Sequence, residues 1–209
     1  MKSAYLSGIA ILFFIAAGIS SASPAGELTE QVRQTTDKII SVLNDPCMKG
    51  PDKKEEKINL IRKLVYTLFD REGVSRRVLA RQWRKLNDQE KKDFIFLFSK
   101  LLEQTYMDRI DNYSGQQVAY IGEKIDGKYG ILKIKILSKN DKDIIVFYKA
   151  IKKNSKWLIY DVSVEGVSLV NNYRTQFQSI IMQSSYDNLI ETLKAKVNKP
   201  HPGKDNTKG

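Results

Sequence analysis

Side chains that could do nucleophilic, acid–base or metal chemistry are few in this sequence and stand far apart. Cys47 is the only cysteine and His201 the only histidine. A Ser-His-Asp triad, a Cys-His pair or a histidine-ligated metal therefore has no support. Asp161 and Glu165 could form an acid–base pair, but structural roles are favoured, as a paired strand carboxylate and as a support for the corner at Gly166. We predict that the protein is not an enzyme and needs no cofactor or metal.

The stretch at residues 156–177 joins two apolar surfaces at a corner. Period-two alternation predicts a strand whose mainly apolar face carries Leu158, Tyr160, Val162 and Val164. Gly166 then permits a turn that a residue with a Cβ would resist. The spacing becomes helical through Val170, Tyr173, Phe177 and Ile180. Such a corner can close over a packed core or over a cavity, and the pattern alone leaves both readings open.

Helices are expected before the sheet. Residues 27–43 and 52–69 show helical periodicity, with the breakers Pro46 and Pro51 between them. A shorter helix is expected over residues 74–84. The strongest helix follows, with Asn87 and Glu90 as its capping box and with a buried face formed by Phe94, Leu97, Phe98, Leu101, Leu102, Thr105 and Tyr106.

Four strands are expected next, at residues 117–125, 129–138, 143–152 and 156–164. Their short connections imply an antiparallel meander, which has one apolar face for the helices to cover. The fold class is therefore α+β. A last helix is expected to start at a box formed by Ser184 and Asp187, and residues 199–209 are expected to form a disordered tail.

Two blocks of sequence carry a family resemblance. One reads YDVSVEGVSLVNNYRTQF at residues 160–177, and the other reads VLARQWRKLNDQEKKDFIFLFSKLLEQTYMDRIDNYSGQQV at residues 78–118. In matching order they resemble the MlaC family, the toluene-tolerance or auxiliary transport proteins that carry phospholipid across the bacterial periplasm. The positions that match are Trp83, Phe94, Phe98, Tyr106, Tyr113, Gly115, Tyr160, Asp161, Val164, Glu165, Gly166, Val167, Ser168, Tyr173, Arg174 and Phe177. The chain departs from many relatives at Ser184-Ser185, where they have glycine.

The resemblance implies a twisted four-stranded antiparallel sheet, wrapped by N- and C-terminal helices around an apolar lipid cavity. Burial of the acyl chains, which contributes about 0.8 kcal/mol per methylene, could supply the whole binding energy of a lipid. The expected wall comprises Phe94, Phe98, Val118, Tyr120, Ile134, Ile136, Val146, Tyr148, Tyr160, Val162, Val164, Val167, Val170, Tyr173 and Phe177. Arg174 could contact a headgroup phosphate, or instead pair with a carboxylate or bond a chain carbonyl. Gly166 is the expected hinge.

The same resemblance implies partners: an outer-membrane lipoprotein complex, and an inner-membrane lipid-binding ring with an ABC transporter. We expect a monomer with a phospholipid ligand, transient contacts with membrane proteins and no nucleic-acid partner. A carrier of hopanoid or another lipid, an exported enzyme on a similar α+β cavity fold, and a ligand-free adaptor remain alternatives.

The N-terminus has the pattern of a secretory leader. Lys2 precedes a short apolar run at residues 8–19, and small residues follow it. We expect a cleaved signal peptide at residues 1–22, alternatively to residue 25, a lipid-binding domain at residues 26–198, and a periplasmic location.

The chain is basic, with 35 Lys and Arg against 24 Asp and Glu and a formal net charge of +11. Cleavage would remove Lys2 alone among the charged residues, so the mature charge becomes 11 minus 1, or +10. This charge favours anionic partners. The densest group of basic residues comprises Arg76, Arg77, Arg81, Arg84 and Lys85. On a helix these side chains would cover much of the circumference instead of forming one stripe, so docking of this group to a membrane is not favoured.

Overall fold

The computed structural model describes residues 26–111, 117–137 and 142–198 of the chain. The expected leader and C-terminal tail lie outside these residues. The helices in the described ranges are α1 (Glu27–Asn44), α2 (Lys54–Leu68), α3 (Arg71–Leu79), α4 (Asp88–Asp111), α5 (Leu169–Gln183) and α6 (Tyr186–Val197), with 3₁₀ turns η1 (Pro46–Met48), η2 (Pro51–Lys53) and η3 (Gln82–Lys85). The strands are β1 (Gln117–Asp126), β2 (Tyr129–Leu137), β3 (Ile144–Lys153), β4 (Lys156–Val164) and β5 (Val167–Ser168).

The α+β class and the antiparallel meander are confirmed, because the strands pair in the order β1-β2-β3-β4-β5 and every pairing is antiparallel. The expected number of four strands is wrong, because the described sheet has five. Glu165 and Gly166 have φ angles of +48° and +82°, the left-handed conformation of a tight hairpin turn. The chain therefore folds back on β4 for two residues before α5 begins.

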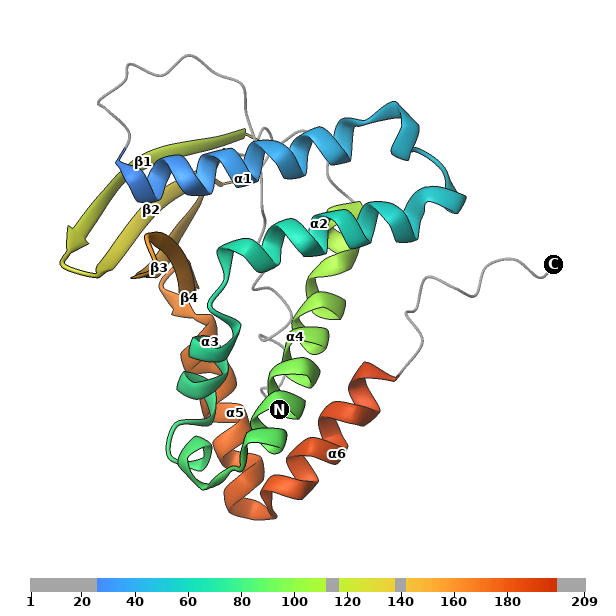
Figure 1. The fold of residues 1–209 in the computed structure, drawn as a ribbon, viewed down its shortest axis with the longest axis vertical. Coiled ribbons are helices and arrows are strands. Elements are labelled where there is room, and N and C mark those ends of the chain that lie inside the picture. The colour runs from blue at the N-terminus through green and yellow to red at the C-terminus, as the bar shows by residue number, and fades with distance from the viewer. Residues whose placement is uncertain (1–25, 112–116, 138–141, 199–209) are drawn as a thin grey trace.

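The helices form two groups around the sheet (Figure 1). In the picture α1 and α2 run side by side across one end of the molecule, and α1 crosses the face of β1 and β2, which it contacts. The helices α3, α4, α5 and α6 pack together at the other end, and α3 and α5 also contact β4. The helical hairpin α1–α2 thus covers a face of the sheet, and the helical lobe adjoins the sheet at β4.

Each group has its own hydrophobic core. The sheet-side core holds Leu28, Val32, Leu68, Val118, Leu132, Ile134, Ile136, Val146, Tyr148, Ala150, Trp157, Ile159, Val162 and Val164. The helix-side core holds Val74, Val78, Leu79, Trp83, Leu86, Phe94, Leu97, Phe98, Leu101, Leu169, Val170, Phe177, Leu189 and Leu193. Burial of these side chains is the main source of stability, at about 1.5–3 kcal/mol for each large one.

A bulge corrects the expected alternation in β4. Lys149 pairs with Asp161 and Ala150 pairs with Ile159, so Tyr160 is the extra residue. An extra residue reverses which side chains face the core. Trp157 and Ile159 therefore share the sheet-side core with Val162 and Val164, whereas Leu158 and Tyr160 are outside it.

Local capping explains where several helices start. The predicted box at α4 is confirmed, because the Glu90 backbone N–H donates to Asn87 Oδ1 and the Asn87 N–H donates to Glu90 Oε2, at 2.9 and 2.7 Å. The box predicted at Ser184 is wrong by one residue, since Ser185 caps α6 by accepting from the Asn188 N–H at 3.1 Å. The expected helix over residues 74–84 is also wrong: α3 ends at Leu79, where Ala80 has φ +49°.

Candidate functional site

The sheet contribution to the predicted wall forms rows across the strands. Strand pairing places Tyr120, Ile134, Val146 and Val164 in one row, and Tyr148 and Val162 in the next, beside Leu132, which the predicted wall did not include. Val118 pairs with Ile136 on the same face. All of these belong to the sheet-side core except Tyr120, which packs half-buried against its margin. The alternation of apolar side chains in β1–β3 thus brings the predicted sheet residues together.

This face is strongly apolar around its tyrosines. Tyr148 is 1% exposed, and burial raises the pKa of its phenol well above the ordinary value. Burial is also the main reason that the pKa of Tyr120 is raised, and the guanidinium of Arg33 lies 4.6 Å from the centre of its ring. Both rings stay neutral at physiological pH, so this face presents apolar rings without adding negative charge.

The helix contribution to the predicted wall is a cluster of aromatic rings. Phe94 and Phe98 on α4 meet Tyr173 and Phe177 on α5, with ring centres separated by 5.0 to 6.0 Å. Several pairs are edge-to-face, a favourable geometry for aromatic rings. Phe94, Phe98 and Phe177 are at most 3% exposed, and Val170 is buried in the same helix-side core. Tyr173 is half-buried at the margin of that core.

The structure therefore divides the predicted wall between two cores, and it places two residues in neither. Tyr160 at the β4 bulge lies under the guanidinium of Arg77, 3.9 Å from its ring centre, and beside the ring of Tyr129. Val167 in β5 is 44% exposed. The roles of all these residues in binding a ligand stay predictions.

A buried carboxylate joins the sheet to the start of α5 at the corner. Asp161 on β4 is 6% exposed and accepts from Ser168 Oγ at 2.8 Å and from the Val170 backbone N–H at 3.1 Å. Lys149 Nζ lies 3.3 Å from the same carboxylate. Ser168 Oγ in turn accepts from the Asn171 N–H. The negative charge therefore satisfies the start of α5 and complements its dipole, so Asp161 fixes the angle between sheet and helix.

Glu165 and Arg174, the candidate site residues near this corner, both form hydrogen bonds with backbone groups. Glu165 Oε1 accepts from the Ile145 N–H at 2.8 Å, which supports the turn at Gly166. Arg174 Nε donates to the Arg77 carbonyl at 2.8 Å, and one terminal nitrogen donates to Asn171 Oδ1 at 3.1 Å. Arg174 is thus tied to α3, and its contact with a headgroup stays a prediction. A Cβ on Gly166 would meet no atom within 4 Å, so only the positive φ restricts this position.

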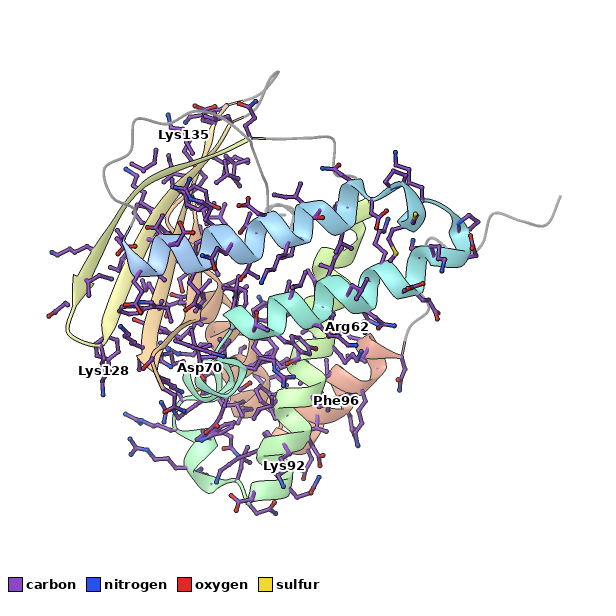
Figure 2. The ribbon with its side chains drawn as sticks, turned by 45° about the horizontal axis from the view of Figure 1, so that its top comes forward. Arg62, Asp70, Lys92, Phe96, Lys128 and Lys135 are labelled. Carbon is purple, nitrogen blue, oxygen red and sulfur yellow. The ribbon has the colours of Figure 1, made fainter. Side chains whose placement is uncertain are left out.

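A polar bridge links α2 to α4 across the two groups of helices. Glu103 on α4 accepts from the Tyr66 hydroxyl and from Arg62 Nε, the latter at 2.8 Å, and Lys100 Nζ lies 3.1 Å away. Figure 2 shows Arg62 on α2 near α4. The Glu103 side chain is only 12% exposed, so its charge needs these partners. Burial and the hydrogen bond to Glu103 raise the pKa of Tyr66 to about 12.

Sequence reasoning missed the part that α1 and α2 take in the sheet-side core, where Leu28, Val32 and Leu68 pack. The apolar periodicity of both helices could have indicated it. It also missed Glu123 on β1, whose carboxylate accepts from the Thr29 N–H and Oγ1 at 2.6 and 2.5 Å and so caps α1. A contact between residues 94 positions apart has no local signal.

Within the described residues, no three or more His, Cys, Asp or Glu side chains gather in a group that could hold a metal ion. In the same ranges, no helix is both long enough and apolar enough to cross a bilayer.

A family model described as MlaC protein matches residues 33–195. The chain belongs to the MlaC family. The intermembrane phospholipid transport system binding protein MlaC of Haemophilus influenzae is 22% identical over 174 residues, which cover 81% of each chain. The solved phospholipid-binding protein of Ralstonia solanacearum, in complex with a phospholipid, is similar with a TM-score of 0.73 and 19% identity, over 82% of this chain and 97% of that one. This likeness confirms the fold, and family membership confirms the resemblance read from the two sequence blocks.

Proposed function

We propose that this chain is a periplasmic phospholipid carrier of the MlaC family, which shields acyl chains inside the protein and shuttles lipid between membrane complexes. The match of residues 33–195 to the family model is the observation that carries this proposal. The fold of a protein solved with a bound phospholipid supports it.

The acyl chains would lie between the sheet-side and helix-side cores. The predicted wall is divided between them, and Val164 and Val170 stand on either side of the corner that Asp161 fixes. A diacyl lipid placed there would be stabilised by about 0.8 kcal/mol per buried methylene, so a single chain of about 16 carbons would contribute roughly 12 kcal/mol. No catalytic group is required for this function.

The remaining assignments belong to the same proposal. Residues 1–22, or 1–25, would be a cleaved signal peptide, residues 26–198 the lipid-binding domain and residues 199–209 a tail. The partners would be an outer-membrane lipoprotein complex and an inner-membrane lipid-binding ring with an ABC transporter, which a monomeric carrier would contact transiently. The name of the Haemophilus relative, an intermembrane transport system binding protein, supports a role between membranes.

Native mass spectrometry of protein purified from the periplasm, followed by lipid extraction, tests the proposal. We expect one phospholipid per chain, and we expect protein unfolded and refolded without lipid to lack that mass. Hopanoid in the extract would favour the carrier of another lipid. Protein that holds no lipid even after incubation with phospholipid vesicles would contradict the proposal.

A further inference from the structure

A pocket of about 510 Å³ opens at the elbow between α3 and η3, outside both predicted walls. Its lining consists of Arg76, Ala80, Arg81, Trp83 and Arg84. The elbow lies at the end of the molecule away from α1, where the chain passes from α3 toward the start of α4 (Figure 1). Trp83 is only 8% exposed and belongs to the helix-side core, so the pocket rests on packed structure.

A break in the backbone gathers these arginines. On an unbroken helix, Arg76, Arg81 and Arg84 would spread over roughly 140° of the circumference. Instead α3 ends at Leu79, and Ala80 takes φ +49° and ψ −116° while its N–H donates to the Arg76 carbonyl at 3.0 Å. The 3₁₀ turn η3 then brings Arg81 and Arg84 to the pocket that Arg76 also lines.

The break also separates Arg77 from the group. Its guanidinium lies over the ring of Tyr160, and its terminal nitrogen donates to the Gly73 carbonyl at 2.9 Å. The structure therefore divides the basic cluster read from the sequence: Arg77 is bound within the fold, three arginines line the pocket, and Lys85 is exposed outside the pocket lining.

The three pocket arginines carry uncompensated charge. All three are exposed, and within the described part of the chain no hydrogen bond or ion pair engages their guanidinium groups. On the C-terminal side of the elbow the nearest acidic residues are otherwise engaged: Asp88 pairs with Lys91 at 3.1 Å, and Glu90 accepts from the Asn87 N–H. On the N-terminal side Glu72 precedes Arg76 by four residues on α3, and within the described residues it forms no ion pair with Arg76. Three like charges around one concave surface repel one another, and a bound anion would relieve that repulsion.

Guanidinium groups are planar donors that match the oxygens of phosphate two at a time. Three of them offer more donors than a single carboxylate can accept, whereas a phosphate group has enough oxygens for all three. We propose that the α3–η3 elbow is a binding site for a phosphate group, held by Arg76, Arg81 and Arg84 beside Trp83. The site stands apart from the proposed lipid interior and does not depend on it. The phosphate could be free in solution or part of an anionic lipid headgroup at a membrane surface.

The test compares two triple variants of the full chain that lose the same charge. One is Arg76→Gln with Arg81→Gln and Arg84→Gln. The control is Lys63→Gln with Lys92→Gln and Lys194→Gln, exposed positions outside the pocket. Inorganic phosphate is titrated while the side-chain N–H signals of arginine and of the two tryptophans are followed by NMR. In a second arm, co-sedimentation is measured with phosphatidylcholine vesicles that contain or lack phosphatidylglycerol.

We expect saturable binding that shifts the indole signal of Trp83 and leaves that of Trp157 in place. The arginine variant should bind about tenfold more weakly or worse, and the lysine control should bind like the parent. A loss confined to inorganic phosphate identifies free phosphate as the source, and a loss confined to phosphatidylglycerol vesicles identifies the headgroup.

Equal weakening by both triple variants would mean a general charge effect, and no saturable binding in either arm would mean no site; both results overturn the proposal. If the arginine variant melts early, the same three positions are changed to Lys. This keeps the charge and removes the paired donors, so binding that is unaffected by it also overturns the proposal.

Discussion

At the scale of single residues, carboxylates on strands accept hydrogen bonds from the first turns of helices that pack against the sheet. Asp161 caps α5 from β4, and Glu123 caps α1 from β1, where the N-cap residue Gly26 has no side chain that could do so. Each negative charge lies at a helix N-terminus, where unpaired N–H groups and the helix dipole favour it. Asp161 and Glu165, the two carboxylates considered as an acid–base pair in the sequence, thus both accept structural hydrogen bonds.

Neighbouring residues on β3 allow a test of the proposed wall. Val146 is 1% exposed in the sheet-side core, whereas Ile145 points to the opposite face and is half-buried. Val146→Glu should abolish lipid co-purification, because a charge facing hydrocarbon is costly unless paired. Ile145→Glu should keep lipid. Native mass spectrometry gives the lipid occupancy, and circular dichroism reports folding.

A milder change covers the case in which Val146→Glu does not fold. Val146→Thr keeps the shape of the side chain and adds one hydroxyl, so it should fold and hold less lipid than the parent. Full occupancy in a folded Val146→Glu variant would show that this residue does not line the ligand.

At the scale of elements, the corner between β4 and α5 and the bridge between α2 and α4 are two of the joints between the layers, beside the contact of the Asp70 N–H with the Ile159 carbonyl. The corner consists of a two-residue turn with positive φ at Glu165 and Gly166, followed by the cap at Asp161. The bridge consists of long polar side chains around Glu103. A ligand held between the layers could leave if such a joint changes its conformation, and the corner and the bridge are the two that can be tested by single substitutions.

Gly166→Ala tests the corner as a hinge. The φ of +82° disfavours alanine, so we expect destabilisation by about 1 kcal/mol and slower lipid exchange with acceptor vesicles. Gly127→Ala is the matched control, because Gly127 also has positive φ, at +54°, and an equally open Cβ position in the β1–β2 turn. If both variants exchange lipid at the parent rate, the corner is a passive turn.

The bridge around Glu103 should make the free energy of unfolding depend measurably on pH. The pKa of Tyr66 is raised from 10.0 to about 12 in the folded protein, so the unfolded state loses its proton first as pH rises. Its contribution to stability is therefore complete below pH 10 and is lost between pH 10 and about 12. Urea unfolding at pH 9 and at about pH 11.5 should show a larger fall in unfolding free energy for the parent than for Tyr66→Phe. The other tyrosines titrate in both proteins and cancel, so equal falls would contradict the role of the bridge.

At the scale of the whole molecule, the chain separates an apolar interior from a basic exterior. The full sequence has a formal charge of +11, and the two cores of the described fold are almost wholly apolar. A carrier between membranes needs both, since the interior must hide hydrocarbon while the exterior approaches anionic surfaces.

The N-terminus of the mature protein is a further prediction at this scale. If Ala22 or Ala25 is the cleavage site, the periplasmic protein should begin at Ser23 or Gly26. A start at Gly26 would place the new α-amino group next to Glu123, since a Cβ on Gly26 would already overlap the Glu123 carboxylate. N-terminal sequencing distinguishes the two, and a membrane fraction that retains Met1 would contradict export.

The sequence by itself determined the α+β class, the meander and the family. β1 to β4 agree closely with the predicted ranges because period-two patterns and short turns are local signals, and the capping box at Asn87 and Glu90 needs only four residues. The apolar residues of β2 and β3 could also be assigned to one face, since strand geometry fixes it once the register is set.

The tertiary structure alone decided which groups meet. The bulge at Tyr160 places Trp157 and Ile159 in the core, although no residue type in that strand predicts a bulge. The bridge at Glu103 and the cap from Glu123 join residues tens of positions apart. The two cores likewise consist of residues from distant parts of the chain. The arginines of the elbow converge because Ala80 breaks the helix. Local patterns fix which elements form, whereas contacts between elements depend on packing that no short window of sequence contains.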